Sequence, residues 1–260
     1  MAKKILFSFL VILIASHSFG QDYSLYEKKL FISKGDTMPY RLLLPENYDA
    51  AKKYPLILFM HGSGERGTNN TSQLIHGGAL FLRDSIRKGY PAIVVLPQGS
   101  PDGTWANATG EKDTSDKPKR IFFTGGKPTR DMVLVQRLVK SVLHEYPVNK
   151  KQVYVGGLSL GGMGTFEIVG RNPRLFAAAF PICGGANVGI APKLKHTSWW
   201  VFHGAEDRAV DPAFSKNMVV AMQALQIPVR FTLYPNTGHN CWGKTFDEPG
   251  LFAWLFAVKK

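Results

Sequence analysis

Short runs of consecutive apolar residues recur along this chain, and segments with helical patterns separate them. Strands of a parallel sheet that helices cover on both faces meet no water, so they appear as continuous apolar runs rather than alternating ones. Strands that alternate with helices predict a layered α/β fold, with a mostly parallel central sheet and helices on both faces. The expected strands are residues 55–60, 92–96, 153–155, 177–182, 199–202 and 229–234.

Three segments between or after these runs carry the periodicity of helices. Residues 131–146 place valines and leucines on one helical face, and residues 211–226 begin with Asp and then Pro, a favourable helix start. Residues 246–260 predict an amphipathic helix that closes the chain. Residues 26–44 alternate around a Lys-Gly-Asp turn, which predicts an N-terminal β-hairpin. Residues 99–130 are rich in Gly, Pro, Lys, Asp and Thr, so we expect a long surface loop there.

The first twenty residues have the pattern of a secretory signal peptide. Two lysines precede an apolar run over residues 5–15, and small residues follow before Gln21. That run is shorter than the roughly 20 residues that a membrane-spanning helix needs. We therefore expect residues 1–20 to be a signal peptide and residues 21–260 to form a single domain. The mature protein would be secreted or periplasmic, with no stable membrane insertion.

The net charge of the chain is strongly positive, at +13. Removal of the two lysines in the predicted signal peptide leaves +11. The basic residues are scattered, and no segment resembles a nucleic-acid-binding module, so we expect no nucleic-acid partner. The composition leaves the oligomeric state open.

One glycine-rich segment carries the clearest chemical signal. Gly157-Leu158-Ser159-Leu160-Gly161 fits the pattern G-x-S-x-G, with an apolar strand before it and a helical pattern after it. In that setting the glycines allow a sharp turn that exposes the serine hydroxyl at the sheet edge, and the helix N-terminus favours negative charge. A turn that only packs a helix on a strand is the alternative interpretation. We predict that Ser159 is a nucleophile.

A serine nucleophile needs a general base, and the histidines are the candidates. Enzymes with this serine turn order their partners along the chain as nucleophile, acid, histidine. His239 follows the serine and the acidic candidates, and it lies just after the last predicted strand. His61 and His203 each end a predicted strand, and we expect both to be buried imidazoles bonded to loop backbone. We predict His239 as the base.

Two carboxylates compete to orient this histidine. Asp207 lies in the loop directly after a predicted strand, where it can reach across to the histidine. Asp211 precedes Pro212 at a helix start, where an aspartate usually caps the helix. We favour Asp207, whose task would be to hold the histidine tautomer and to stabilise the imidazolium.

The oxyanion and substrate contacts are predicted from position. The Leu160 N–H, at the start of the helix, and the Ser63 N–H, in the turn after the first buried strand, would form an oxyanion hole. Trp105 and Trp242 are candidate substrate contacts, because sugars and aromatic acyl groups both pack on indole. Ordinary packing is the alternative role for both tryptophans.

The chain has two cysteines, Cys183 and Cys241. They lack the ligand spacing of a structural zinc site, so we expect no metal. Cys183 follows a predicted strand, and Cys241 comes two residues after His239, so both should lie near the catalytic edge of the sheet. Because an exported chain meets an oxidising compartment, we predict a Cys183–Cys241 disulfide; two free thiols are the alternative.

Five segments taken together resemble a known family. They look like the exported esterase branch of the α/β-hydrolases that is described as phospholipase/carboxylesterase or predicted peptidase, which is related to feruloyl esterases, acetyl-xylan esterases and polyester depolymerases. The resemblance covers nearly all of the mature chain and implies the α/β-hydrolase fold, a triad of Ser159, Asp207 and His239, and no metal or organic cofactor. The segments are residues 61–67, 157–162, 181–185, 203–207 and 238–242.

The expected activity is the hydrolysis of carboxylic esters through an acyl-enzyme, on a small-molecule or polysaccharide-linked substrate such as an acyl or feruloyl ester. A serine peptidase with the same triad is the first alternative. A glycan-binding protein that has kept the fold without catalysis is the second, and the three intact triad residues argue against it.

Overall fold

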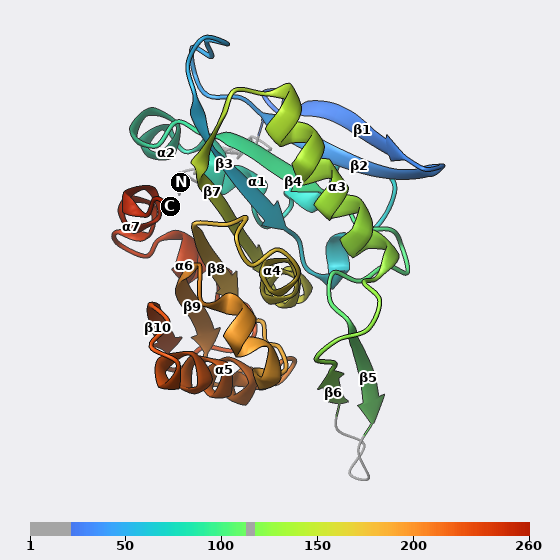
Figure 1. The fold of residues 1–260 in the computed structure, drawn as a ribbon, viewed down its shortest axis with the longest axis vertical. Coiled ribbons are helices and arrows are strands. Elements are labelled where there is room, and N and C mark those ends of the chain that lie inside the picture. Colours follow the sequence, from blue (N-terminus) through green and yellow to red (C-terminus); the bar gives the residue numbers. More distant parts are fainter. Residues whose placement is uncertain (1–21, 113–117) are drawn as a thin grey trace, which may run out of the picture.

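A computed structural model describes residues 22–112 and 118–260, so the predicted signal peptide lies outside the described residues. The core is an eight-stranded sheet in the order β1-β2-β4-β3-β7-β8-β9-β10 (Figure 1). The β1–β2 and β2–β4 pairs are antiparallel, and every later neighbour pair is parallel. The strands are β1 Glu27–Ser33, β2 Asp36–Leu43, β3 Tyr54–Met60, β4 Ile93–Pro97, β7 Val148–Leu158, β8 Ala178–Ile182, β9 Ser198–Gly204 and β10 Val229–Tyr234.

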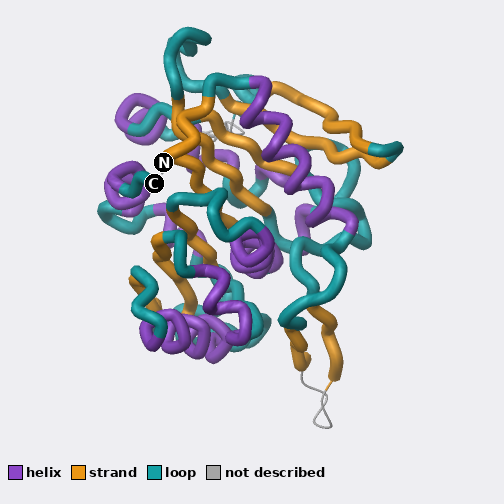
Figure 2. The backbone as a smooth tube through the Cα atoms, viewed as in Figure 1, coloured by secondary structure: helices purple, strands orange, loops and turns teal. Residues whose placement is uncertain are grey.

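Helices cover both faces of this sheet, as the alternating pattern predicted. Strand β3 shows the division, because Leu56 and Leu58 join the core under α3, α4 and α5, whereas Ile57 and Phe59 join the core under α1 and α7. Figure 2 shows these helices around the strands. The helices are α1 Gly78–Leu82, α2 Asp84–Gly89, α3 Arg130–Glu145, α4 Leu160–Arg171, α5 Pro212–Ala224, α6 Trp242–Phe246 and α7 Leu251–Ala257, with 3₁₀ turns η1 Ser63–Glu65, η2 Ser72–Leu74 and η3 Val188–Leu194.

Two segments differ from the sequence-based expectation. The stretch 99–130 is not a loop throughout, because β5 (Ala108–Lys112) and β6 (Pro118–Phe122) pair as an antiparallel hairpin that projects from the body (Figure 1). Of the closing helix expected over residues 246–260, only α7 (Leu251–Ala257) is a helix, because α6 ends at Phe246. Gly250, with φ 82°, caps the start of α7 in a left-handed conformation that glycine adopts without strain, and this interrupts the helix.

The parallel strands gather the predicted site at one edge of the sheet. Ser159 follows β7, Cys183 follows β8, Asp207 follows β9, and His239 follows β10. Carboxyl ends of parallel strands meet at a common edge, which is where open α/β sheets hold their ligands. Among the residues that the structure describes, no helix has the length and apolarity to cross a membrane.

Candidate active site

Ser159 stands on a sharp, strained turn between β7 and α4. Its φ of 53° and ψ of −114° lie in a region that non-glycine residues rarely adopt. The Ser159 N–H donates to the Ile182 carbonyl at 2.8 Å, which ties the turn to the end of β8. This geometry projects the side chain from the sheet edge, in the manner of a nucleophile elbow.

The glycines around this serine are required by close backbone approach. A Cβ on Gly157 would lie 2.6 Å from the carbonyl oxygens of Met60 and Gly161, and a Cβ on Gly161 would overlap the Met60 carbonyl. Real Cβ atoms do not come so close to backbone. The start of α4 is thus pressed against the end of β3, which brings the following turn next to Ser159.

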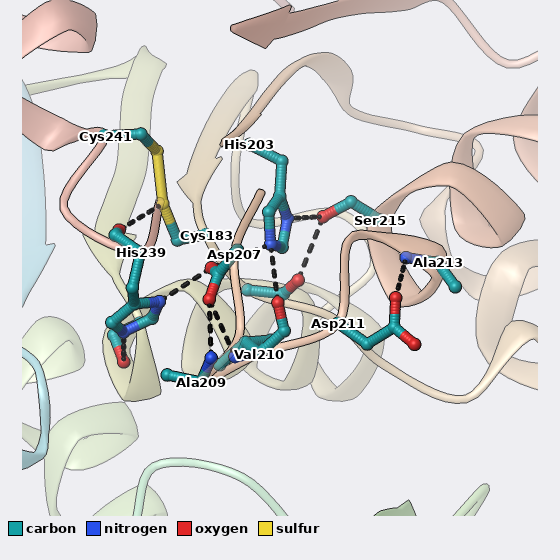
Figure 3. Close-up of polar contacts among 12 residues, drawn as sticks. Cys183, His203, Asp207, Ala209, Val210, Asp211, Ala213, Ser215, His239 and Cys241 are labelled. Carbon is teal, nitrogen blue, oxygen red and sulfur yellow. Dashed lines mark hydrogen bonds and ion pairs between the residues drawn. A yellow bond between two sulfur atoms is a disulfide. The ribbon is translucent and has the colours of Figure 1, made fainter. Parts of the chain in front are cut away.

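Ser159, His239 and Asp207 form a continuous hydrogen-bonded relay. His239 Nε2 lies 2.9 Å from Ser159 Oγ. His239 Nδ1 lies 2.7 Å from Asp207 Oδ2 (Figure 3). The Asp207 side chain is fully buried, whereas 27% of the His239 side chain is exposed. A substrate can therefore reach the histidine and serine end, and the carboxylate is kept from water.

Several donors converge on the Asp207 carboxylate. Oδ1 accepts the backbone N–H groups of Ala209 and Val210, each at 2.9 Å. Oδ2 accepts from His239 and is also 3.1 Å from His203 Nε2. Burial alone would raise the pKa of Asp207, but hydrogen bonds from the two histidines and the Val210 N–H outweigh it and hold this pKa well below its usual range. Asp207 is therefore an ionised group throughout the neutral pH range.

Asp211, the competing carboxylate, has the local role that its position suggested. It is the N-cap of α5, and its Oδ1 accepts the Ala213 N–H at 2.8 Å (Figure 3). Its side chain is exposed and bonds within its own turn rather than to His239.

The turn after β3 packs directly on Ser159. An added Cβ on Gly62 would lie 3.6 Å from the Ser159 Cβ, so the backbone that leads into Ser63 runs beside the serine. Ser63 begins η1 and Leu160 begins α4, and N–H groups in a first helical turn have no partner within the helix. Both predicted oxyanion donors therefore lie on elements that flank Ser159.

Trp105 lies in the core, contrary to the expectation of a substrate contact. Only 1% of it is exposed, and its Nε1 donates to the His61 carbonyl at 3.1 Å. Its indole therefore has no face open to a ligand, and the residue packs against the start of the turn after β3. His61 is buried beside it, and its Nε2 accepts the Gly99 N–H at 2.9 Å.

Trp242 has a different setting, at the rim of the relay. Its ring is partly buried and lies edge-on to the His239 ring, with centroids 5.7 Å apart. His76 packs on it with centroids 5.1 Å apart, and His76 Nε2 lies 3.5 Å from Glu65 Oε1. Glu65 is 6% exposed, and its Oε2 has no hydrogen-bond partner among the described residues. Sequence reasoning missed His76 and Glu65, because no spacing along the chain links them to Trp242.

Cys183 and Cys241 form a disulfide beside the relay (Figure 3). Their Cα atoms are 6.9 Å apart, and Cys183 Sγ lies 3.0 Å from the His239 carbonyl oxygen. Cys183, Asp207 and His239 bring potential metal-ligand atoms within 4.8 Å of one another. The disulfide occupies the sulfur and the relay occupies the other two groups, so this donor set does not fit a metal ion.

Comparisons with known proteins place these features in a family. Residues 33–239 match the model of the Esterase family, described as "Putative esterase". The chain is 24% identical over 178 residues to "Probable feruloyl esterase C" of Aspergillus flavus, covering 68% of this chain and 57% of that protein. It is 24% identical over 226 residues to "Endo-1,4-beta-xylanase/feruloyl esterase" of Xylanibacter ruminicola, covering 83% of this chain and 29% of that protein.

A solved structure, "Crystal Structure of a Thermostable Esterase", superimposes with a TM-score of 0.80 at 29% identity, covering 91% of this chain and 64% of the other. The match spans a little over half the length of the Aspergillus flavus protein and less than a third of the Xylanibacter ruminicola protein. The fold is the α/β-hydrolase fold expected from the sequence, with its N-terminal hairpin. Because the family model covers most of the chain, this protein belongs to the Esterase family.

Proposed function

We propose that this protein hydrolyses carboxylic esters through an acyl-enzyme formed on Ser159. The observation that carries the proposal is the relay itself: Ser159 on a strained elbow, 2.9 Å from His239, which is 2.7 Å from a buried carboxylate. Membership of the Esterase family supports the reaction class.

In the first half-reaction, Ser159 Oγ attacks the ester carbonyl carbon while His239 Nε2 takes the hydroxyl proton. The carbonyl oxygen becomes an oxyanion, which the N–H groups of Leu160 and Ser63 stabilise. Asp207 fixes the tautomer with a proton on Nδ1, so that Nε2 faces the serine as an acceptor. The C–O bond then breaks, and the leaving alcohol takes the proton from His239.

In the second half-reaction, water replaces the alcohol. His239 takes a proton from the water while the water oxygen attacks the acyl carbon, and the second oxyanion forms at the same N–H groups. The bond between the acyl carbon and Ser159 Oγ then breaks, and His239 returns the proton to Ser159 Oγ. This step releases the carboxylic acid and regenerates Ser159, so each turnover consumes one ester and one water.

The proposed substrate class is an acyl or feruloyl ester carried by a small molecule or a polysaccharide. The names of the relatives support it, because both include feruloyl esterase and one includes xylanase. Trp242 supplies a partly exposed indole edge-on to His239, on which a ferulate ring or a sugar can pack. We further propose that residues 1–20 direct export, so that a single domain over residues 21–260 acts in the periplasm or outside the cell.

A hydrolysis panel with a matched variant tests the proposal. The panel contains p-nitrophenyl acyl esters, methyl ferulate, acetylated xylan and peptide amides, and Ser159→Ala should lower kcat on the esters by about 10⁴- to 10⁶-fold without loss of the fold. A fluorophosphonate should label the wild type at Ser159. Faster cleavage of amides than of esters would support a peptidase instead, and no turnover at all would support a binding protein.

The two aspartates provide an internal control for the relay. Asp207→Asn should lower kcat by about 10⁴-fold, because an amide at this position favours the wrong histidine tautomer. Asp211→Asn should leave kcat and stability near the wild-type values, since asparagine caps helices as well as aspartate does. A larger kcat loss in Asp211→Asn would overturn the assignment of the acid.

A further inference from the structure

A second histidine contacts the carboxylate of the relay. His203, at the end of β9, is fully buried, and its Nε2 lies 3.1 Å from Asp207 Oδ2, the same oxygen that accepts from His239. Its other nitrogen, Nδ1, lies 2.8 Å from the hydroxyl of Ser215 on α5. Figure 3 shows the two imidazoles on opposite sides of Asp207. The catalytic scheme above uses only one of them.

The groups around His203 fix where its protons lie. Nε2 faces Asp207 Oδ2 and, at 3.0 Å, the Val210 carbonyl, and both are acceptors. Nε2 therefore carries a proton. The Ser215 hydroxyl lies 2.9 Å from the Gly184 carbonyl, also an acceptor, and has a single proton to give. If that proton goes to Gly184, Nδ1 must donate to Ser215 Oγ.

Among the contacts of the described residues, a proton on each nitrogen of His203 gives every group in this buried network a hydrogen-bond partner. A neutral ring that accepted from Ser215 would leave the Gly184 carbonyl without the hydroxyl's proton, and unpaired buried polar groups are costly. The ionised Asp207, fully buried beside it, supplies the opposite charge that a buried imidazolium requires.

We propose that His203 is a positioning residue of the relay that is held as an imidazolium by Asp207, Val210 and Ser215, and that it balances the charge of Asp207 so that His239 stays a free base at lower pH. The catalytic part of this proposal rests on the proposed function. The protonation of His203 does not.

The electrostatic reason lies in the charge that His239 faces. The Asp207 carboxylate at 2.7 Å stabilises the imidazolium that His239 becomes during the reaction, but its full charge would also favour a proton on the resting ring at acidic pH. With an imidazolium on the same oxygen, His239 faces a neutral pair. The other ionisable groups near Asp207, along the chain and on α5, have exposed side chains that solvent screens. These groups are Glu206, Arg208, Asp211 and Lys216. Cys183 does not ionise, because it is held in the disulfide.

Nitrogen-15 NMR of histidine-labelled protein tests the protonation directly. At pH 7, long-range ¹H–¹⁵N spectra should show both ring nitrogens of His203 protonated, in the wild type and equally in the inactive Ser159→Ala variant. A deprotonated Nδ1 on His203 would overturn the proposal whatever the enzyme's activity. In Ser215→Ala, which removes the acceptor of Nδ1–H, the ring should become neutral.

The pH profile of kcat/KM tests the catalytic consequence. His203→Gln keeps an amide donor of similar reach but removes the charge, so the acidic limb should move to higher pH by about one unit. Ser215→Ala should move it in the same direction. Thr197→Val is the matched control. Thr197 directly precedes β9, at the opposite end from His203, and its buried hydroxyl donates to the Phe176 carbonyl. This variant should lower stability and leave the limb in place.

The outcomes separate charge from packing. If His203→Gln and Ser215→Ala lose stability but keep the wild-type acidic limb, His203 serves only the fold and the proposal is wrong. If neither the wild type nor any variant hydrolyses an ester, the proposed function fails, and the NMR result on His203 still stands by itself.

Discussion

His61 directly follows β3, and His203 lies near the end of β9; both are buried, yet their hydrogen-bond partners differ. His61 Nε2 accepts the Gly99 N–H, so that nitrogen cannot carry a proton without breaking the bond. Burial lowers the pKa of His61 to about 4. His203 faces acceptors instead, among them an ionised aspartate. The residue type and the sheet edge are the same, and the neighbours set the hydrogen bonds of each ring.

The low pKa of His61 predicts a pH dependence of stability. In the unfolded chain a histidine takes up a proton near pH 6.5, whereas the folded protein resists it down to about pH 4. The unfolded state therefore binds more protons in this window, and the free energy of unfolding should fall as pH drops from about 6.5 to 4, by on the order of 3 kcal/mol in total. Denaturant titrations at a series of pH values measure it.

His61→Gln is the control for this effect, since its amide oxygen can accept the Gly99 N–H but does not titrate. The variant should lack most of the slope between pH 6.5 and 4. Asp207 acts in a lower window, because its depressed pKa gives stability that is complete above about pH 4, the unfolded value, and is lost only as pH falls further. An equal slope in wild type and His61→Gln would contradict the assignment to His61.

At the scale of elements, α4 contains two glycines in different surroundings. Gly161, in the first turn, has no room for a side chain because the Met60 carbonyl occupies the Cβ position. Gly170, near the other end of the helix, has only ordinary contacts, with the nearest atom 3.5 Å from an added Cβ. The first glycine is required by tertiary packing, and the second is not.

This contrast predicts opposite results for one substitution on one helix. Gly161→Ala should displace the turn after β3 and lower kcat by about 100-fold, with a loss of stability, because small misplacements of reacting groups are costly. Gly170→Ala should raise the free energy of unfolding by about 0.5–1 kcal/mol and leave kcat unchanged. Thermal unfolding and ester hydrolysis measure both. Equal effects at the two sites would show that the crowding at Gly161 is relieved at little cost.

The disulfide joins the end of β8 to the loop that carries His239. It closes a loop of 58 residues, for which chain entropy gives about 4 kcal/mol of stabilisation. Reduction should lower both the melting temperature and kcat, since His239 loses its tether to the sheet. The double variant Cys183→Ala/Cys241→Ala should show the same losses without reductant and no further change with it.

Thiol counting supplies the direct measurement. Denatured, unreduced protein should contain no free thiol. Two free thiols per chain in protein from an oxidising compartment would contradict the disulfide, and full activity in reduced protein would contradict its role in holding the His239 loop.

At the scale of the whole molecule, the basic first residues and the apolar run after them predict export. Protein recovered from the periplasm or the medium should begin near Gln21, with the mass of residues 1–20 absent, as intact mass and N-terminal sequencing would show. Export would also allow the disulfide to form, because it moves both cysteines into an oxidising compartment. Recovery of folded protein that retains Met1 in the cytoplasm would contradict the prediction.

The sequence by itself determined the features that depend on local pattern. Apolar runs between helical segments predicted the covered parallel sheet, since burial on both faces leaves no polar position in a strand. The motif around Ser159 indicated a sharp turn between a strand and a helix, and Asp207 and His239 follow it in the order that enzymes with this serine turn use. Asp211, followed by Pro212, carried its helix-capping role in its immediate neighbours.

Only the tertiary structure decided the features that depend on distant neighbours. Trp105 reads as a loop residue, yet it is buried because its indole fits beneath the turn after β3 and bonds to His61. His203 bonds to residues of the loop after β9 and of α5, and Ser215 extends the network to Gly184 in the loop after β8, so no local pattern indicates it. Sequence spacing limits which residues can be neighbours at a sheet edge, but the hydrogen-bond partners, and with them the proton on each imidazole, are set by packing.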